Sequence, residues 1–271
     1  MNLRKPARVN LLYWTTVLAA CSIGETFGDL VSHELGLGYV KASALFLCAF
    51  GLLFAIERKA RVRSEARYWA AIVTMSTTGT ALADLFTRTL HFGYAWTSLF
   101  LTGLFAGVLL VARLARRTDA APGPAVAPAQ ANLPAADAGY WAAIMVASTL
   151  GTSLGDFVSN VLKVGFGGGT LLLGTLLAGI LLAEQLARNT SAVRYWAALL
   201  ITSTIGATSG DYLTKEDGLH LPFALVIVAQ VALFVGLILV AAARRRAPAV
   251  APQAAPAREA PAPSDALLTQ G

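Results

Sequence analysis

"YWAAIMVASTLGTSLGDFVSN", residues 140–160, is an apolar segment that carries an aspartate, Asp156, fifteen positions after Trp141. The same pattern occurs four times, because Tyr-Trp pairs begin at residues 13, 68, 140 and 195 and each tryptophan is followed fifteen positions later by an aspartate. A glycine stands ten positions after each tryptophan, and a small residue precedes each aspartate. Agreement at fixed offsets in four copies indicates an internal repeat of one structural unit.

Each repeat contains two apolar segments, and the motif lies in the first. The second segments are expected at about residues 42–56, 96–112, 170–187 and 221–243. The chain is 56% hydrophobic and only 13% charged, whereas soluble domains are about one quarter charged. Segments of this kind cross a hydrocarbon core of roughly 30 Å as helices. The sequence therefore predicts an all-α polytopic membrane protein with eight transmembrane helices in four parallel two-helix repeats, with pseudo-symmetry about the membrane normal.

The basic residues predict the orientation of these helices. Sixteen of the 21 lysines and arginines lie beside the first segment's start or the second segment's end, Arg258 lies in the tail on the same side, and the other four, Lys41, Arg88, Lys163 and Lys215, lie in the alternate loops. By the positive-inside rule the first side is cytoplasmic, so both termini are expected there. The net charge of +6 thus reflects topology, and we expect the lipid bilayer and no nucleic acid as a partner. A homo-oligomer or a cytoplasmic partner is left open.

Spacing divides the chain into two similar halves. The tryptophans are 55, 72 and 55 residues apart, and an Ala/Pro-rich stretch fills the longer interval. We expect a first half at 1–117, a cytoplasmic linker at 118–138, a second half at 139–246 and a disordered cytoplasmic tail at 247–271.

Four tandem two-span units, each marked by a tryptophan and a Gly…Asp helix, resemble the bacterial integral-membrane family catalogued as a "repeat of unknown function". The resemblance extends from Tyr13 to about Arg246, with Ala83 in place of glycine in the second unit and a divergent loop, "KEDGLHLPF", in the fourth. It implies a multi-pass protein of the bacterial cytoplasmic (inner) membrane and no particular activity.

Helical periodicity gives the motif segments two special faces. One is polar, with Glu25, Asp29 and His33 in the first unit and Thr152 and Asp156 in the third. The other is made of small residues, which allow close packing of membrane helices. Both faces are expected to point inward, while the tryptophans are expected to anchor the cytoplasmic interface. The packing glycines are Gly24, Gly28, Gly79, Gly151, Gly155, Gly206 and Gly210, and the anchors are Trp14, Trp69, Trp141 and Trp196.

The four aspartates differ in their neighbours. Asp84 and Asp211 each have a basic residue four positions on, Arg88 and Lys215, so we expect structural ion pairs there. Asp29 and Asp156 have no such partner. Since an ionised group in a membrane span costs about 2.5–3.5 kcal/mol and commonly marks a functional site, these two are the predicted cation-binding carboxylates. Glu25, His33 and Thr152 are the further candidate ligands.

The leading functional hypothesis is a carrier or channel for a small cation, either a metal ion or a proton. Carboxylates and hydroxyls favour hard cations over soft metals. A bound cation of undetermined identity is the only cofactor this hypothesis admits. The alternative is a non-transporting scaffold or regulator whose polar faces only hold the bundle together. Catalysis is not expected: "GTSLG", residues 151–155, matches G-x-S-x-G, but its serine does not recur in the other repeats and the motif requires a strand–turn–helix.

Overall fold

The computed structural model describes residues 10–59, 64–118, 137–187 and 191–246. These ranges contain helices and no strands, as the sequence predicts. The predicted linker, apart from its ends, and the predicted tail lie outside the described residues. The long helices are α1 (Leu11–Asp29), α2 (Tyr39–Lys59), α3 (Glu65–Asp84), α4 (Gly93–Thr118), α5 (Ala138–Asp156), α6 (Gly165–Ala187), α7 (Ala192–Thr214) and α8 (Phe223–Arg246).

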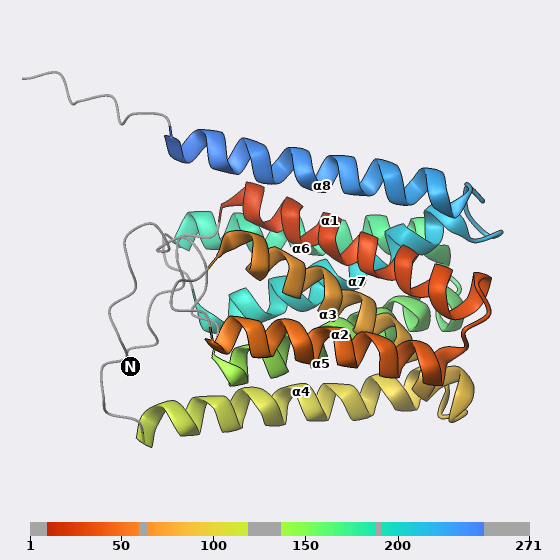
Figure 1. Ribbon diagram of the computed structural model, residues 1–271, viewed down its shortest axis with the longest axis horizontal. Coiled ribbons are helices and arrows are strands. Elements are labelled where there is room, and N and C mark those ends of the chain that lie inside the picture. Colours follow the sequence, from red (N-terminus) through yellow and green to blue (C-terminus); the bar gives the residue numbers. More distant parts are fainter. Residues whose placement is uncertain (1–9, 60–63, 119–136, 188–190, 247–271) are drawn as a thin grey trace, which may run out of the picture.

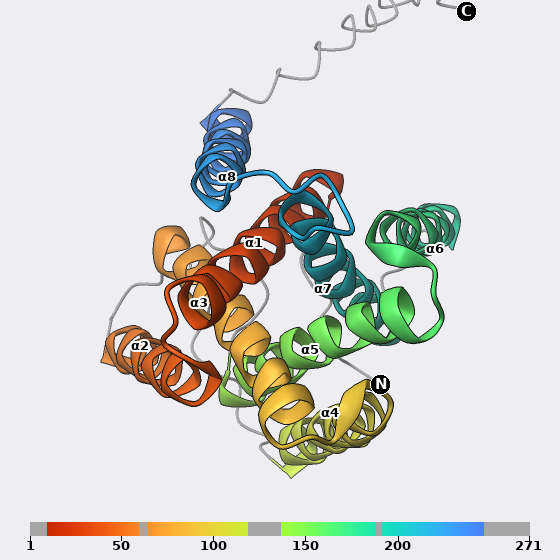
Figure 2. The same cartoon turned by 90° about the vertical axis from the view of Figure 1, so that its right-hand side faces the viewer.

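The four motif helices form an inner ring. In the ring α1 packs on α3, α3 on α5, α5 on α7, and α7 on α1. Figure 2 shows this ring end-on, with α2, α4, α6 and α8 outside it. The outer helices pack on α3, α5, α7 and α1, respectively, so each covers the inner helix of the next repeat. The two predicted halves therefore share one continuous ring.

Glycines set the close approach of the inner helices. A Cβ atom at Gly79 would lie 2.7 Å from the Ser148 Cβ atom on α5, and one at Gly151 would lie 2.7 Å from the Ser203 Cβ atom on α7. Real Cβ atoms do not approach so closely, so the ring has this diameter only because these positions lack a side chain. Gly24 and Gly206 face Ser76 and Cys21 in the same way. The small-residue face thus packs helix against helix, as expected.

Hydrogen bonds join three outer helices to the inner ring. They connect pairs of hydroxyls between α4 and α5 and between α6 and α7, and an amide with a hydroxyl between α8 and α1. The pairs are Ser98 and Ser153 at 2.9 Å, Thr170 and Thr208 at 2.9 Å, and Gln230 and Ser22 at 2.9 Å.

The outer surface is apolar in the way a lipid-facing surface is. Large hydrophobic side chains such as Leu171, Val228 and Leu239 are exposed on the outer helices. Five helices are long and apolar enough to cross a membrane: α2, α4, α5 with its extension to Val161, α6 and α8. The remaining inner helices carry inward polar faces, which lower their mean hydropathy. A membrane protein is the class that fits this surface.

The four motif tryptophans lie against the inner helices. Trp14 is 2% exposed, and Trp69 and Trp141 are each 5% exposed, while Trp196 is half-buried. Each indole packs edge-on against the tyrosine before it and tilted against the tyrosine of the preceding repeat in the ring, as Trp69 does with Tyr68 at 5.2 Å and Tyr13 at 5.7 Å between ring centroids. The described contacts of these indoles are thus between inner helices, and their position at the cytoplasmic interface stays a prediction.

Candidate functional site

The four motif aspartates lie at the same end of the inner ring, here called the aspartate end, which is on the right in Figure 1. All four are buried, with exposures between 3% and 6%. In the first three repeats the helix continues past the aspartate as a π-helical turn: η1 (Leu30–Glu34), η2 (Leu85–Thr89) and η4 (Phe157–Val161). Such turns within α-helices are frequent at functional sites.

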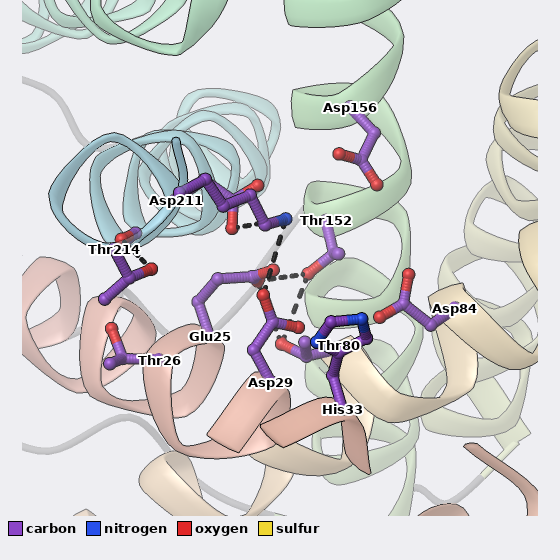
Figure 3. A network of polar contacts seen from close by, with 12 residues as sticks. Glu25, Thr26, Asp29, His33, Thr80, Asp84, Thr152, Asp156, Asp211 and Thr214 are labelled. Atoms are coloured by element: carbon purple, nitrogen blue, oxygen red, sulfur yellow. Dashed lines mark hydrogen bonds and ion pairs between the residues drawn. The ribbon is translucent and has the colours of Figure 1, made fainter. Parts of the chain in front are cut away.

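Glu25 lies at the centre of the site, one helical turn before Asp29. Its Oε2 atom accepts hydrogen bonds from Thr80 Oγ1 at 2.9 Å and from Thr152 Oγ1 at 2.8 Å. These hydroxyls come from α3 and α5, so the Glu25 side chain is held from two other helices of the ring (Figure 3). Gly210 on α7 makes room for it, because a Cβ atom there would lie 3.0 Å from the Glu25 Cβ atom.

Three carboxylates form a compact cluster, defined here as the triad: Glu25, Asp29 and Asp211. One oxygen of each lies within 4.8 Å of those of the other two, and all three residues are buried. Oxygen atoms at this spacing match the donors that a hard cation takes. Asp211 thus joins Glu25 and Asp29, where the sequence hypothesis placed Asp156.

The ammonium group of Lys215 contacts two carboxylates of the triad. Its Nζ atom lies 2.7 Å from Asp211 Oδ1 and 3.4 Å from Asp29 Oδ2. The same ammonium lies 5.2 Å from the centre of the Phe166 ring, within the range of a cation–π contact. The predicted pair with Asp211 is present, and Asp29, which we expected to be without a basic partner, shares the lysine.

His33 is not part of the cluster. Its side chain is 69% exposed, and its Nδ1 atom lies 3.3 Å from the neighbouring Glu34 Oε1 atom. The π-helical turn η1 explains the difference: in it Leu35 N donates to Leu30 O, five residues back, at 2.8 Å. This wider turn moves His33 off the line through Glu25 and Asp29 that a regular α-helix would produce.

The other two aspartates have separate partners. Asp84 Oδ1 accepts from Arg88 Nε at 2.7 Å, which is the predicted structural ion pair. Asp156 accepts only a long bond, 3.4 Å, from the Asn160 amide among the described residues. Figure 3 shows Asp156 on α5, set apart from the triad.

A cavity of about 600 Å³ lies at the aspartate end, and Asp29 is the triad residue that lines it. Asp29, Asp84, Arg88 and Lys215 line it, together with exposed acids of the surrounding loops, Glu34, Glu216 and Asp217. This cavity, here called the vestibule, therefore reaches the triad at Asp29 and is lined by more acidic than basic side chains.

The opposite end of the ring, here called the tyrosine end, is closed by four hydroxyls. The repeat tyrosines form a cycle of hydrogen bonds between Tyr13 and Tyr68 (2.9 Å), Tyr68 and Tyr140 (2.8 Å), Tyr140 and Tyr195 (3.0 Å), and Tyr195 and Tyr13 (3.1 Å). All four side chains are buried. Sequence reasoning used these tyrosines only as repeat markers, although their occurrence in every repeat was the signal for a shared role.

The comparisons with known proteins identify the repeat. The family described as "Repeat of Unknown Function" (DUF347) matches residues 12–62, 67–118, 139–190 and 194–247. The chain therefore belongs to this family, and the four-repeat organisation predicted from the sequence is confirmed. No curated protein and no solved structure matches the chain.

Proposed function

We propose that the protein is a carrier or channel for a small cation in the bacterial inner membrane, with all eight helices crossing the bilayer. α1 has 19 residues, about 28 Å at 1.5 Å per residue, which suits a hydrocarbon core of about 30 Å. The polar faces that keep α1, α3 and α7 below the hydropathy of lipid-exposed helices are covered by neighbouring helices. The cyclic packing supports pseudo-symmetry about the membrane normal, and the basic flanks support a cytoplasmic position for both termini.

The excess of buried negative charge is the observation that carries the proposal. The inner helices present five buried carboxyl groups near the aspartate end, those of Glu25 and the four motif aspartates. The described cations that pair with them are Arg88 and Lys215. Because a bare charge in a low-dielectric interior is costly, the remaining carboxylates favour a bound proton or metal cation.

The difference between the two ends of the inner ring supports transport of the cation and not only its binding. The vestibule reaches Asp29 of the triad from the aspartate end, whereas the tyrosine cycle lies across the other end. Tyr13 and Glu25 are twelve residues apart, about 18 Å along the helix. In this proposal a cation bound at the triad exchanges with the vestibule at Asp29 and is separated from the other side by the tyrosine cycle, which is the arrangement of a carrier in one of its two access states.

Each residue has a role in this proposal. Glu25, Asp29 and Asp211 supply the carboxylate oxygens, and Thr80 and Thr152 fix the Glu25 side chain. Asp84 and Arg88 brace repeat two. The orientation of the site toward the periplasm follows from the same assignment of the termini.

The test is ion flux into liposomes that contain the purified protein. Entrapped indicators would report protons, Na⁺, K⁺, Mg²⁺ and Mn²⁺ separately, with protein-free liposomes as the blank. Glu25→Gln removes the central charge, and since a hydrogen bond to a charged group is worth about 1.5–3 kcal/mol, flux of the transported ion should fall by about tenfold or more. Glu57→Gln is the control, because Glu57 at the end of α2 pairs with Arg67 at the start of α3, near the tyrosine end and away from the triad, and this change should leave flux unchanged.

A non-transporting scaffold is the second candidate, and the polar contacts between helices favour it. In a scaffold, the hydrogen bonds from Thr80 and Thr152 to Glu25 would only hold α1, α3 and α5 together. Liposomes that show no flux of any tested ion, combined with a Glu25→Gln variant that melts at a lower temperature, would support the scaffold and refute the carrier.

A further inference from the structure

The backbone around Lys215 differs from that around Arg88, the residue at the same offset in the second repeat. Arg88 occupies the same offset but lies within the π-helical turn η2 and pairs with the aspartate of its own helix. Repeat four has no such turn: α7 ends at Thr214, and Lys215 has the extended backbone angles φ −82° and ψ 156°. Lys215 therefore belongs to the loop, and its side chain folds back over the end of α7.

The ammonium of this lysine is placed where a bound cation would be. It contacts carboxylates from two different helices, Asp211 on α7 and Asp29 on α1, and it faces the Phe166 ring on α6. Two of its carboxylate partners belong to the triad. A positively charged group thus sits on the triad while it remains attached to the chain by four methylenes.

We infer that Lys215 is the resting occupant of the cation site and that an incoming cation displaces its ammonium from Asp29 and Asp211. This inference rests on the proposed function. A tethered charge acts as an internal competitor at a high effective concentration, millimolar or more for a short tether. It neutralises the triad when no other cation is bound and lowers the apparent affinity for the transported one.

The vestibule gives the displaced side chain a place to go. Lys215 is 27% exposed there, and Glu34, Glu216 and Asp217 line the same cavity. These acids are exposed and can accept the ammonium in a hydrated setting. Movement of one lysine between the triad and the vestibule acids couples cation entry to a change of charge at the vestibule.

Chemical rescue of a cysteine variant tests the inference. Lys215→Cys would be made in a Cys48→Ala background, since Cys48 is exposed whereas Cys21 is buried. Reaction with 2-aminoethyl methanethiosulfonate restores an ammonium of lysine-like length, and methyl methanethiosulfonate adds a neutral group of smaller size. The readout is the concentration of Na⁺, Mg²⁺, Mn²⁺ or methylammonium that gives half of the maximal thermal stabilisation in detergent.

We expect that the Lys215→Cys change removes the competition between the ammonium and the added cation, and that the aminoethyl reagent restores it. The cysteine variant should respond at a concentration lower by about tenfold or more, as follows from removal of a competitor present at several times its own dissociation constant. Attachment of the aminoethylthio group, as a disulfide with methanesulfinate leaving, should restore the original concentration, and attachment of the methylthio group should not. Arg88→Cys is the matched comparison, because it removes a cation that does not contact the triad, and its shift should be smaller.

The results that would contradict the inference differ from those that would contradict the proposed function. If Lys215→Cys melts early and no cation restores it, the lysine is a structural strut and the inference is wrong. If the intact protein responds to a cation and the cysteine variant responds at the same concentration, the inference also fails while the proposed function stands. If neither the intact protein nor any variant responds to a cation or carries flux, the proposed function itself fails.

Discussion

Removal of two hydroxyls from the tyrosine cycle should have an effect that depends on which two are removed. Tyr13 and Tyr140 lie opposite each other, because each bonds to Tyr68 and Tyr195 and not to the other. Tyr13 and Tyr68 are neighbours in the cycle. The variants Tyr13→Phe/Tyr140→Phe and Tyr13→Phe/Tyr68→Phe have the same composition and differ only in geometry.

The expected difference in stability between the two double variants follows from the number of hydrogen bonds that each one removes from the cycle. The opposite pair removes all four hydrogen bonds and leaves Tyr68 and Tyr195 without a partner in the cycle. The neighbouring pair removes three bonds and leaves Tyr140 bonded to Tyr195 at 3.0 Å. The two double variants thus differ by one hydrogen bond, about 1 kcal/mol, and by two buried hydroxyls that lack a partner only in the opposite pair, each of which costs about 1–3 kcal/mol. The opposite pair should therefore be less stable by about 2 kcal/mol or more.

Unfolding in detergent with increasing denaturant would measure this difference, with helix content followed by circular dichroism. The quadruple phenylalanine variant adds a second comparison, because it removes the two stranded hydroxyls and should be more stable than the opposite pair. Equal stabilities for the two double variants, or a quadruple variant less stable than the opposite pair, would show that water replaces the missing hydroxyls and that the cycle does not seal this end.

Three further predictions concern single positions. Gly151→Val should abolish correct folding, judged by monodisperse yield in detergent, because its Cβ atom meets Ser203, whereas Gly174→Val should be tolerated because nothing lies within 4 Å there. Thr152→Val should weaken cation-dependent stabilisation by about fivefold, the equivalent of about 1 kcal/mol for a lost hydrogen bond to Glu25, whereas Thr149→Val should not, since Thr149 bonds to its own helix. Asp84→Asn should lower the melting temperature by a few degrees, about 1 kcal/mol for a partly exposed ion pair, and an unchanged melting temperature would contradict its role as a brace.

The arrangement of helices was largely predictable from the repeat. Fixed offsets placed the glycine and aspartate positions of every motif helix on faces that must turn inward, and the ring has them there. The tryptophans illustrate the limit of this reasoning. Indole rings are typical of membrane interfaces, but an indole that follows a tyrosine in every repeat also suits ring-to-ring packing, and only the contacts decide between the two.

The sequence predicted the residue types of the candidate site, but it did not predict which carboxylates lie close together. Glu25 and Asp29 were expected together from helical spacing, and the structure has them together. Asp211 could not be placed beside them, because it is 182 residues from Asp29 and the two meet only when α7 packs on α1. The displacement of His33 depends on a π-helical turn, for which the sequence around Leu30 carries no recognised signal.

The site is formed where the repeats differ, and this is the strongest physical reason to regard it as functional. Eleven positions after the tryptophans the residues are glutamate, threonine, threonine and alanine, and nineteen positions after them histidine, arginine, asparagine and lysine. Packing needs are alike in all four repeats, as the recurring glycines show, so packing alone would not select one buried glutamate and one lysine. Glu25 and Asp29 come from the first repeat, and Asp211 and Lys215 from the last. Closure of the ring by α7 against α1 therefore builds the site at the seam between the first and last repeats, and any change that opens that seam separates Glu25 and Asp29 from Asp211 and Lys215.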